Sequence, residues 1–237
     1  MAVVAGNTSG IRVVDISNPA APAVIGTYDT PGVAFGVALN STGNLAYVAD
    51  GAEGLKVISL SNPRSPSLVG SLKTGYVYRD IEVLGTKVFL ANQGGTLDVM
   101  DVTNPAAPSF LASKSVTGGG FYLRVAGSYA AVIGKTSTSD ILNIVNITTP
   151  SNPVLEGSAT VGAVGSVTGV ELTTDGFVYV AAGGEGLKIY NISNPANPLL
   201  DTTVTVPGTA RDVMVENLYA YTTGFPGTLS IIDLYAQ

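Results

Sequence analysis

Apolar and polar residues alternate along short runs throughout this chain, and glycine, proline and asparagine cluster between the runs. A period of two residues places successive side chains on opposite faces of an extended strand, so each run is expected to be a β-strand. In one stretch the pattern predicts four strands, at residues 35–39, 45–49, 55–60 and 67–72. No segment reads as a long helix, and the pattern therefore predicts an all-β protein.

The third predicted strand of this stretch carries a phrase that recurs six times, usually an apolar strand followed by Ser/Thr-Asn-Pro. One position of the phrase marks the copies: Asp15, Ser59, Asp101, Asn146, Asn191 and Asp233. Successive copies lie 42–45 residues apart. A period of this length is typical of propeller blades or solenoid units.

Counting strands along the repeats gives 22, two short of six four-stranded blades. Residues 2–30 supply only the last three strands of a unit, and residues 210–237 only the first three. Radial closure favours a propeller, because each small sheet can bury both faces against its neighbours. We expect one β-propeller domain over residues 1–237 with six antiparallel blades, the first and last incomplete; five or seven blades stay possible. Met1 opens directly into a predicted strand, which favours a fragment of a larger secreted or surface protein.

The Asn-Pro segment after the third strand is expected to be framework. Each proline removes a backbone donor and biases the preceding residue toward an extended geometry, while Asn and Ser side chains can cap the turn. The marker position alternates between Asp, Asn and Ser, all of which can accept a turn hydrogen bond. A set of metal ligands would not tolerate that exchange so freely, so the phrase itself predicts no site.

Composition narrows the function classes. The chain of 237 residues has no cysteine and no histidine, which excludes Ser-His-Asp and Cys-His catalysis and removes the commonest metal ligand. Only 11 Lys and Arg against a net charge of −6 argue against nucleic acid as a partner. No run approaches the ~18 apolar residues of a membrane span, and no signal peptide is recognisable in this sequence.

The repeated phrases Val-Val-Asp-Ile-Ser-Asn-Pro and Ile-Ile-Asp-Leu, with preceding strands such as Ala-Tyr-Val-Ala-Asp-Gly, resemble the LVIVD repeat of bacterial and archaeal surface proteins. The resemblance covers nearly the whole chain. It implies a β-propeller of extracellular or cell-surface character, commonly a module of a larger secreted polypeptide. It carries over no catalytic residues, because the shared motif is the blade framework.

Candidate binding residues come from the starts of the inner strands. These starts are expected on one face, called here the loop-rich face, together with the loops between second and third strands and those joining successive blades. Aligning the starts places two Arg-Asp pairs and aromatics around the mouth of a central channel, where a ligand pocket could form. The candidate residues are Phe35, Arg79, Asp80, Phe121, Tyr122, Arg211 and Asp212. The alternative is that each arginine forms a salt bridge with the aspartate of a neighbouring blade and only locks the framework.

Three acidic residues in glycine-rich loops, Asp50, Glu53 and Glu185, are weak candidates for calcium. The ligand spacing of an EF-hand is absent, so solvated loop carboxylates are the expectation, and we expect no metal and no cofactor.

Three functions stay open at this point. The favoured one is a non-catalytic extracellular scaffold that binds a protein or glycan at the loop-rich face. The second is an enzyme using carboxylates alone, such as a glycoside hydrolase or a lyase with a pair drawn from Asp50, Glu53, Asp80, Glu185 and Asp212. The third is a purely structural repeat array or an engineered sequence. Neither the ligand nor the oligomeric state follows from the sequence.

Overall fold

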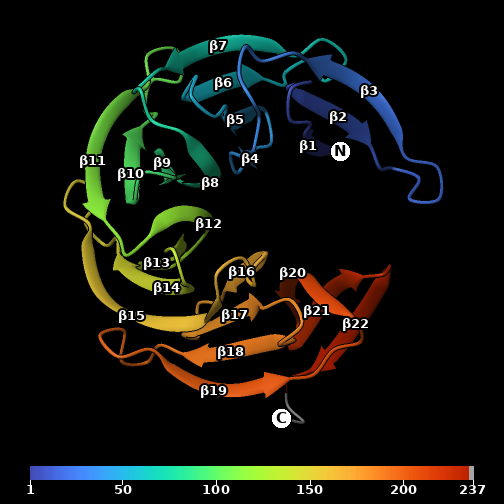
Figure 1. Cartoon of the computed structure of the whole chain (residues 1–237). Helices are drawn as coiled ribbons and strands as arrows, with labels where there is room; N and C mark the ends of the chain where they lie inside the picture. Colours follow the sequence, from blue (N-terminus) through green and yellow to red (C-terminus); the bar gives the residue numbers. More distant parts are fainter. Residues whose placement is uncertain (235–237) are drawn as a thin grey trace. The chain divides into compact units, whose positions relative to one another are not determined.

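A computed structural model describes residues 1–234, which form 22 strands and no helix (Figure 1). The strands make six antiparallel sheets, each built from consecutive strands: four sheets of four strands, and a first and last sheet of three. The predicted fold class is confirmed: an all-β propeller of six small blades, incomplete at both ends. None of the described residues belongs to a helix long and apolar enough to cross a membrane.

By the density of internal contacts the chain divides into two compact units, Met1–Ser113 and Lys114–Gln237. The first unit contains blades 1 to 3. Blade 1 comprises β1 (Ala2–Ala5), β2 (Ile11–Asp15) and β3 (Ala23–Tyr28). Blade 2 comprises β4 (Gly36–Leu39), β5 (Leu45–Ala49), β6 (Leu55–Ser59) and β7 (Ser67–Leu72). Blade 3 comprises β8 (Tyr78–Leu84), β9 (Lys87–Asn92), β10 (Thr96–Asp101) and β11 (Ser109–Ser115), the last of which runs into the second unit.

The second unit contains blades 4 to 6. Blade 4 comprises β12 (Gly119–Ala126), β13 (Tyr129–Lys135), β14 (Ser139–Asn146) and β15 (Val154–Ala163). Blade 5 comprises β16 (Gly169–Leu172), β17 (Phe177–Ala181), β18 (Leu187–Asn191) and β19 (Leu199–Val204). Blade 6 comprises β20 (Thr209–Glu216), β21 (Tyr219–Phe225) and β22 (Thr228–Asp233).

The core of each unit lies between successive blades, because the period-two pattern gives every sheet two apolar faces. We call the face that carries Leu187 and Ile189 in blade 5 the B face, and the opposite face the A face, in every blade. Leu187 and Ile189 share one buried cluster with Val213, Ala220 and Ile232 from the A face of blade 6. The B face of a blade thus packs against the A face of the next.

The other interfaces inside the two units follow the same rule. Ile11 and Val13, from the B face of blade 1, cluster with Val48 and Ile58 from the A face of blade 2. Equivalent clusters join blade 2 to blade 3 and blade 4 to blade 5. The strand alternation that first indicated β-structure therefore also builds the contacts between blades.

The turns after the third strands are built as the repeated phrase predicts. The Ser17 N–H donates to Asp15 Oδ1 at 2.9 Å and the Thr103 N–H donates to Asp101 Oδ1 at 2.8 Å. Asn191 accepts in the same way from Ser193, at 2.8 Å. The exchangeable marker position is a turn acceptor, as expected from its residue types.

Candidate binding site at the inner-strand bulges

The starts of three inner strands, β4, β8 and β20, are tied to the preceding blade on the loop-rich face. Asn7, in the loop between β1 and β2, exchanges backbone hydrogen bonds of 3.0 and 3.2 Å with Ala34, just before β4. The Ala210 N–H likewise donates to the Gly183 carbonyl oxygen at 2.9 Å. The second-to-third-strand loops and the starts of the next inner strands therefore share one face in these blades.

β-Bulges interrupt three inner strands, and in β8 and β20 the bulge follows an anchored residue, Tyr78 or Ala210. The register of the inner strand shifts between Tyr78 and Asp80, between Gly120 and Tyr122, and between Ala210 and Asp212. The register skips one residue in each bulge: Arg79, Phe121 and Arg211. A bulge changes the direction in which its extra residue points. The local backbone, and not the strand pairing, therefore sets the orientation of these three side chains.

In the first unit the bulge brings Arg79 over an aromatic ring of the preceding blade. The guanidinium carbon of Arg79 lies 4.2 Å from the ring centroid of Phe35, and its Nε donates to Gln93 Oε1 at 2.9 Å. Phe35 and Arg79 are both half-buried, and Gln93 is exposed. The three side chains form a cation–π pair with a polar neighbour, partly open to solvent.

Asp80 has a framework role beside this pair. Its Oδ1 accepts the Ile81 N–H at 2.9 Å, and a Cβ added to Gly36 of blade 2 would lie 3.0 Å from the same oxygen. Asp212 repeats the arrangement in the second unit, since its Oδ1 accepts the Val213 N–H at 3.0 Å. Each aspartate thus accepts a hydrogen bond from the backbone N–H of the residue that follows it, just after the bulge.

The second unit holds the other candidates. The Lys135 Nζ lies 5.0 Å from the ring centroid of Phe121 and 5.2 Å from that of Tyr122, and it donates to the Val167 carbonyl oxygen at 3.3 Å. Arg211 and Asp212 are both exposed. The structure thus places the candidates in two groups, Phe35, Arg79 and Asp80 in one unit and Phe121, Tyr122, Arg211 and Asp212 in the other. Lys135 and Gln93 belong to these groups and were missed by strand alignment, because they lie at the ends of second strands.

The loop carboxylates have protein partners. Asp50 is fully buried and accepts from Thr30 Oγ1 at 2.6 Å and from the Gly32 N–H at 3.0 Å; burial raises the pKa of its carboxyl group. Glu53 pairs with Lys73 at 2.5 Å, and Glu185 pairs with Lys188 at 2.7 Å. Within residues 1–234 no group of three or more acidic side chains is arranged to hold a metal ion. Asp50 therefore holds the segment that connects blades 1 and 2 by two hydrogen bonds.

The sequence model of the LVIVD repeat matches residues 2–30, 31–74, 75–115, 165–206 and 207–234. The chain belongs to the LVIVD repeat family. The matched segments are blades 1, 2, 3, 5 and 6, and blade 4 carries Thr148-Thr149-Pro150 where other copies have Ser/Thr-Asn-Pro. A search of curated proteins found no match.

Solved structures share the fold of this LVIVD protein at low sequence identity. The β-propeller domain of Cps50 (Swd1) from Myceliophteria thermophila has a TM-score of 0.76 and 12% identity, over 98% of this chain and 79% of that one. A protein from Lactobacillus plantarum has a TM-score of 0.74 and 14% identity, over 96% and 78%. The computationally designed Ika8 protein has a TM-score of 0.72 and 13% identity, over 97% of this chain and 66% of that one. These likenesses establish the propeller fold.

A polar position inside the third strand of the LVIVD blades was also missed. Three residues before the marker position, the phrase is polar in all six copies: Arg12, Lys56, Asp98, Asn143, Lys188 and Ser230. Asp98 is fully buried and accepts four hydrogen bonds, from Tyr78 Oη (2.9 Å), Thr96 Oγ1 (2.7 Å), Ser113 Oγ (2.5 Å) and Asn92 Nδ2 (3.2 Å). Burial is the main reason that the pKa of the Tyr78 hydroxyl is raised. A polar residue recurring within an apolar phrase is the pattern that could have predicted this network.

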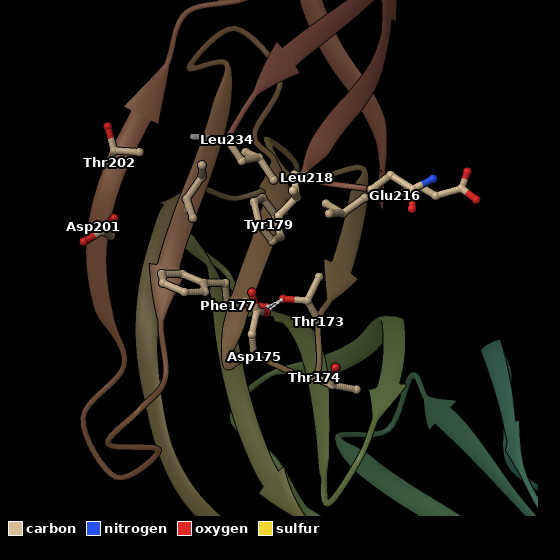
Figure 2. Close-up of a pocket in the computed structure, with 13 residues that line it drawn as sticks. Thr173, Thr174, Asp175, Phe177, Tyr179, Asp201, Thr202, Glu216, Leu218 and Leu234 are labelled. Atoms are coloured by element: carbon tan, nitrogen blue, oxygen red, sulfur yellow. Dashed lines mark hydrogen bonds between the residues drawn. The ribbon is translucent and has the colours of Figure 1, made fainter. Parts of the chain in front are cut away.

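A groove of about 560 Å³ lies at the opposite end of blades 5 and 6, among the short turns (Figure 2). Its walls include Phe177, Tyr179 and Leu218, with Asp201 and Thr202 on the outer strand β19 (Figure 2). In blade 4 the residue equivalent to Thr202 is Gly157, which packs against Pro195 and Ala196 of the next blade's turn.

Proposed function

We propose that this LVIVD-repeat propeller is a non-catalytic interaction module of the cell surface or extracellular space, binding a protein or glycan at its loop-rich face. The propeller scaffold itself is established by the family and the fold. The location and the partner rest on the family resemblance and on the chemistry of the bulge residues. The proposed function needs no cofactor.

The observation that carries the proposal is the Phe35–Arg79 pair. The ring and the guanidinium are half-buried, stacked at 4.2 Å and steadied by Gln93, so their exposed parts are held in one place. Aromatic residues and arginine are enriched at interfaces, because they offer large contact area and directional donors at modest entropic cost. The bulge position is Arg in blades 3 and 6 and Phe in blade 4, whereas the Asn-Pro turns repeat in blades 1, 2, 3 and 5.

The carboxylate-enzyme alternative gains no support from the groups that would carry it. Such a reaction requires two carboxyl groups roughly 5 to 9 Å apart on either side of the substrate. Asp50 is buried against Thr30 and Gly32, while Glu53 and Glu185 are each paired with lysine in different units. Asp80 and Asp212 accept backbone hydrogen bonds next to their bulges. We therefore propose no catalytic residue.

A panel of immobilised neutral and acidic oligosaccharides and acidic peptides tests the proposal directly. We expect one class of probe to retain the protein, and we expect Arg79→Ala combined with Arg211→Ala to abolish retention with a nearly unchanged thermal melt. Arg64→Ala is the matched control, because Arg64 is an exposed arginine of an Asn-Pro turn. Retention that is equal in both variants, or a melt that collapses in the first, would assign the arginines to the framework alone.

A further inference from the structure

The second unit holds two cationic residues beside one short segment of blade 5. Lys135 ends β13 in blade 4, and Arg211 lies at the bulge of β20 in blade 6. The Lys135 Nζ donates to the Val167 carbonyl oxygen at 3.3 Å, and a Cβ added to Gly169 would lie 3.1 Å from the Arg211 carbonyl oxygen. Both cationic residues therefore lie against residues 167–169 of blade 5, on the loop-rich face.

No carboxylate of the described chain neutralises either cation. Among residues 1–234, Lys135 and Arg211 form no ion pair. The second unit is nevertheless acidic, with five Lys and Arg against nine Asp and Glu. An acidic unit thus carries two cations without an anionic partner on one face.

The acidic residues around this segment have other partners. Asp140 is fully buried, and it accepts the backbone N–H of Val167 at 2.8 Å and that of Gly165 at 3.0 Å. Glu185 pairs with Lys188 at 2.7 Å. The carboxylate next to Arg211 in the sequence, at position 212, accepts the backbone N–H of the residue that follows it. These hydrogen bonds hold the carboxylates in the framework and leave the two cations to an external anion.

Arg211 differs from its counterpart Arg79 in the residue beneath it. The residue equivalent to Phe35 in blade 5 is Thr168, because the backbone N–H of each donates to the alanine carbonyl oxygen at the end of the second strand. Phe35 covers one side of the Arg79 guanidinium, whereas Thr168 has no ring and donates its hydroxyl to a backbone carbonyl oxygen at 3.2 Å. Arg211 is exposed, so its guanidinium donors are accessible to a ligand.

Hydroxyl groups and aromatic rings surround the two cations. The hydroxyl residues are Thr136, Ser166 and Thr168, and the rings are those of Phe121 and Tyr122 beside Lys135. A hydroxyl group both donates and accepts, which suits the many hydroxyl groups of a sugar, and an aromatic ring adds an apolar surface. Peptides are usually recognised by a strand edge or by an apolar groove. The chemistry around Lys135 and Arg211 therefore favours a sugar that carries a negative charge.

We propose that Lys135 and Arg211 bind the carboxylates of an acidic oligosaccharide, such as a chain of uronic acids, on the loop-rich face of the second unit. The inference rests on the proposed function and names the ligand class. An ammonium or guanidinium group forms charge-assisted hydrogen bonds to a carboxylate, and these are stronger than neutral ones. This subsite adds to the contact made by the Phe35–Arg79 pair and does not replace it.

Isothermal titration with matched pairs of sugars tests the inference. The probes are oligosaccharides of galacturonate, glucuronate and mannuronate, each beside its carboxyl-reduced neutral derivative. We expect at least one acidic probe to bind at least about tenfold more tightly than its neutral derivative, and Lys135→Ala combined with Arg211→Ala to remove that preference. The control is Arg64→Ala combined with Lys73→Ala, which removes the same charge from two exposed residues of the first unit and should keep the preference.

The outcomes separate this inference from the proposed function. Equal affinity for the acidic and neutral sugars, or a preference that survives loss of Lys135 and Arg211, would overturn the inference and leave the interaction module standing. Binding of acidic peptides without binding of any acidic sugar would do the same. Failure of every sugar and every peptide to bind would overturn both. Should the double variant fail to fold by circular dichroism, Arg211→Ala alone should lower the preference at least about threefold, and an unchanged preference would overturn the inference.

Discussion

Gly157 of β15 packs directly against Pro195, the proline of the next blade's Asn-Pro turn. A Cβ at Gly157 would lie 2.5 Å from the Pro195 carbonyl oxygen and 2.5 Å from that of Ala196. Gly26 and Gly70 meet the Pro63 and Pro105 carbonyl oxygens in the same way in the first unit. The proline turn and the outer-strand glycine thus form one contact, although they lie about 40 residues apart in the sequence.

Gly157→Ala is therefore expected to destabilise the protein by roughly 1 to 3 kcal/mol, because the added methyl group forces the Pro195 turn away. Urea unfolding followed by circular dichroism measures the change. Gly184→Ala is the matched control, since a Cβ there meets no atom within 4 Å. Equal unfolding free energies for the two variants would show that β15 can shift to accommodate the methyl group without loss of stability.

Asp98→Ala is expected to cost more, about 2 to 4 kcal/mol, because it leaves several buried donors without an acceptor. Tyr78 is the most buried of these donors, and its hydroxyl lies 2.9 Å from Asp98 Oδ2. Chemical unfolding of Asp98→Ala against Asp201→Ala, an exposed aspartate on β19, makes the comparison. A loss no larger than that of Asp201→Ala would mean that water replaces the carboxylate.

The sequence predicted the blades better than it predicted the surface. Period-two alternation and the recurring phrase determine strand order, the missing strands and the turn role of Asp15, because these depend on neighbours along the chain. Gln93 and Lys135 were missed, because their partners Arg79 and Phe121 come from other strands. The groove beside Tyr179 was also missed, since its walls come from β17, from β19 and from the turn before β21. Contacts between strands that are far apart in the sequence leave no pattern among neighbouring residues from which they could be predicted.

A double-mutant cycle on Phe35 and Arg79 is expected to give a coupling energy of about 0.5 to 1 kcal/mol in unfolding free energy, because the guanidinium lies on the ring face. The cycle uses Phe35→Leu, Arg79→Ala and the double variant. A cycle on Phe35 and Arg64 serves as the control and should give no coupling. Additive effects of Phe35→Leu and Arg79→Ala would mean that the stacked geometry contributes nothing in solution.

Asp101 is expected to make stability depend on pH at the acidic end. Hydrogen bonds from the Thr103 hydroxyl and N–H, together with Lys87, lower the pKa of Asp101 to about 2 from its ordinary 3.8. A carboxyl group whose pKa is lower in the folded than in the unfolded state contributes stability that is present above the unfolded value and is lost as pH falls through the folded value. The contribution of Asp101 should therefore be complete above about pH 4 and disappear toward about pH 2.

Replacing Asp101 with Asn should flatten the fall in stability over that window and leave the pH dependence at higher pH unchanged, since the amide does not titrate. The midpoint of urea unfolding, measured at intervals between about pH 2 and about pH 7, gives the profile. Asp201→Asn is the control, because Asp201 is exposed on β19 and removes one carboxylate without touching the Thr103 turn. Profiles for Asp101→Asn and the unmodified chain that run parallel through the acidic window would show that the turn hydrogen bonds do not survive in solution.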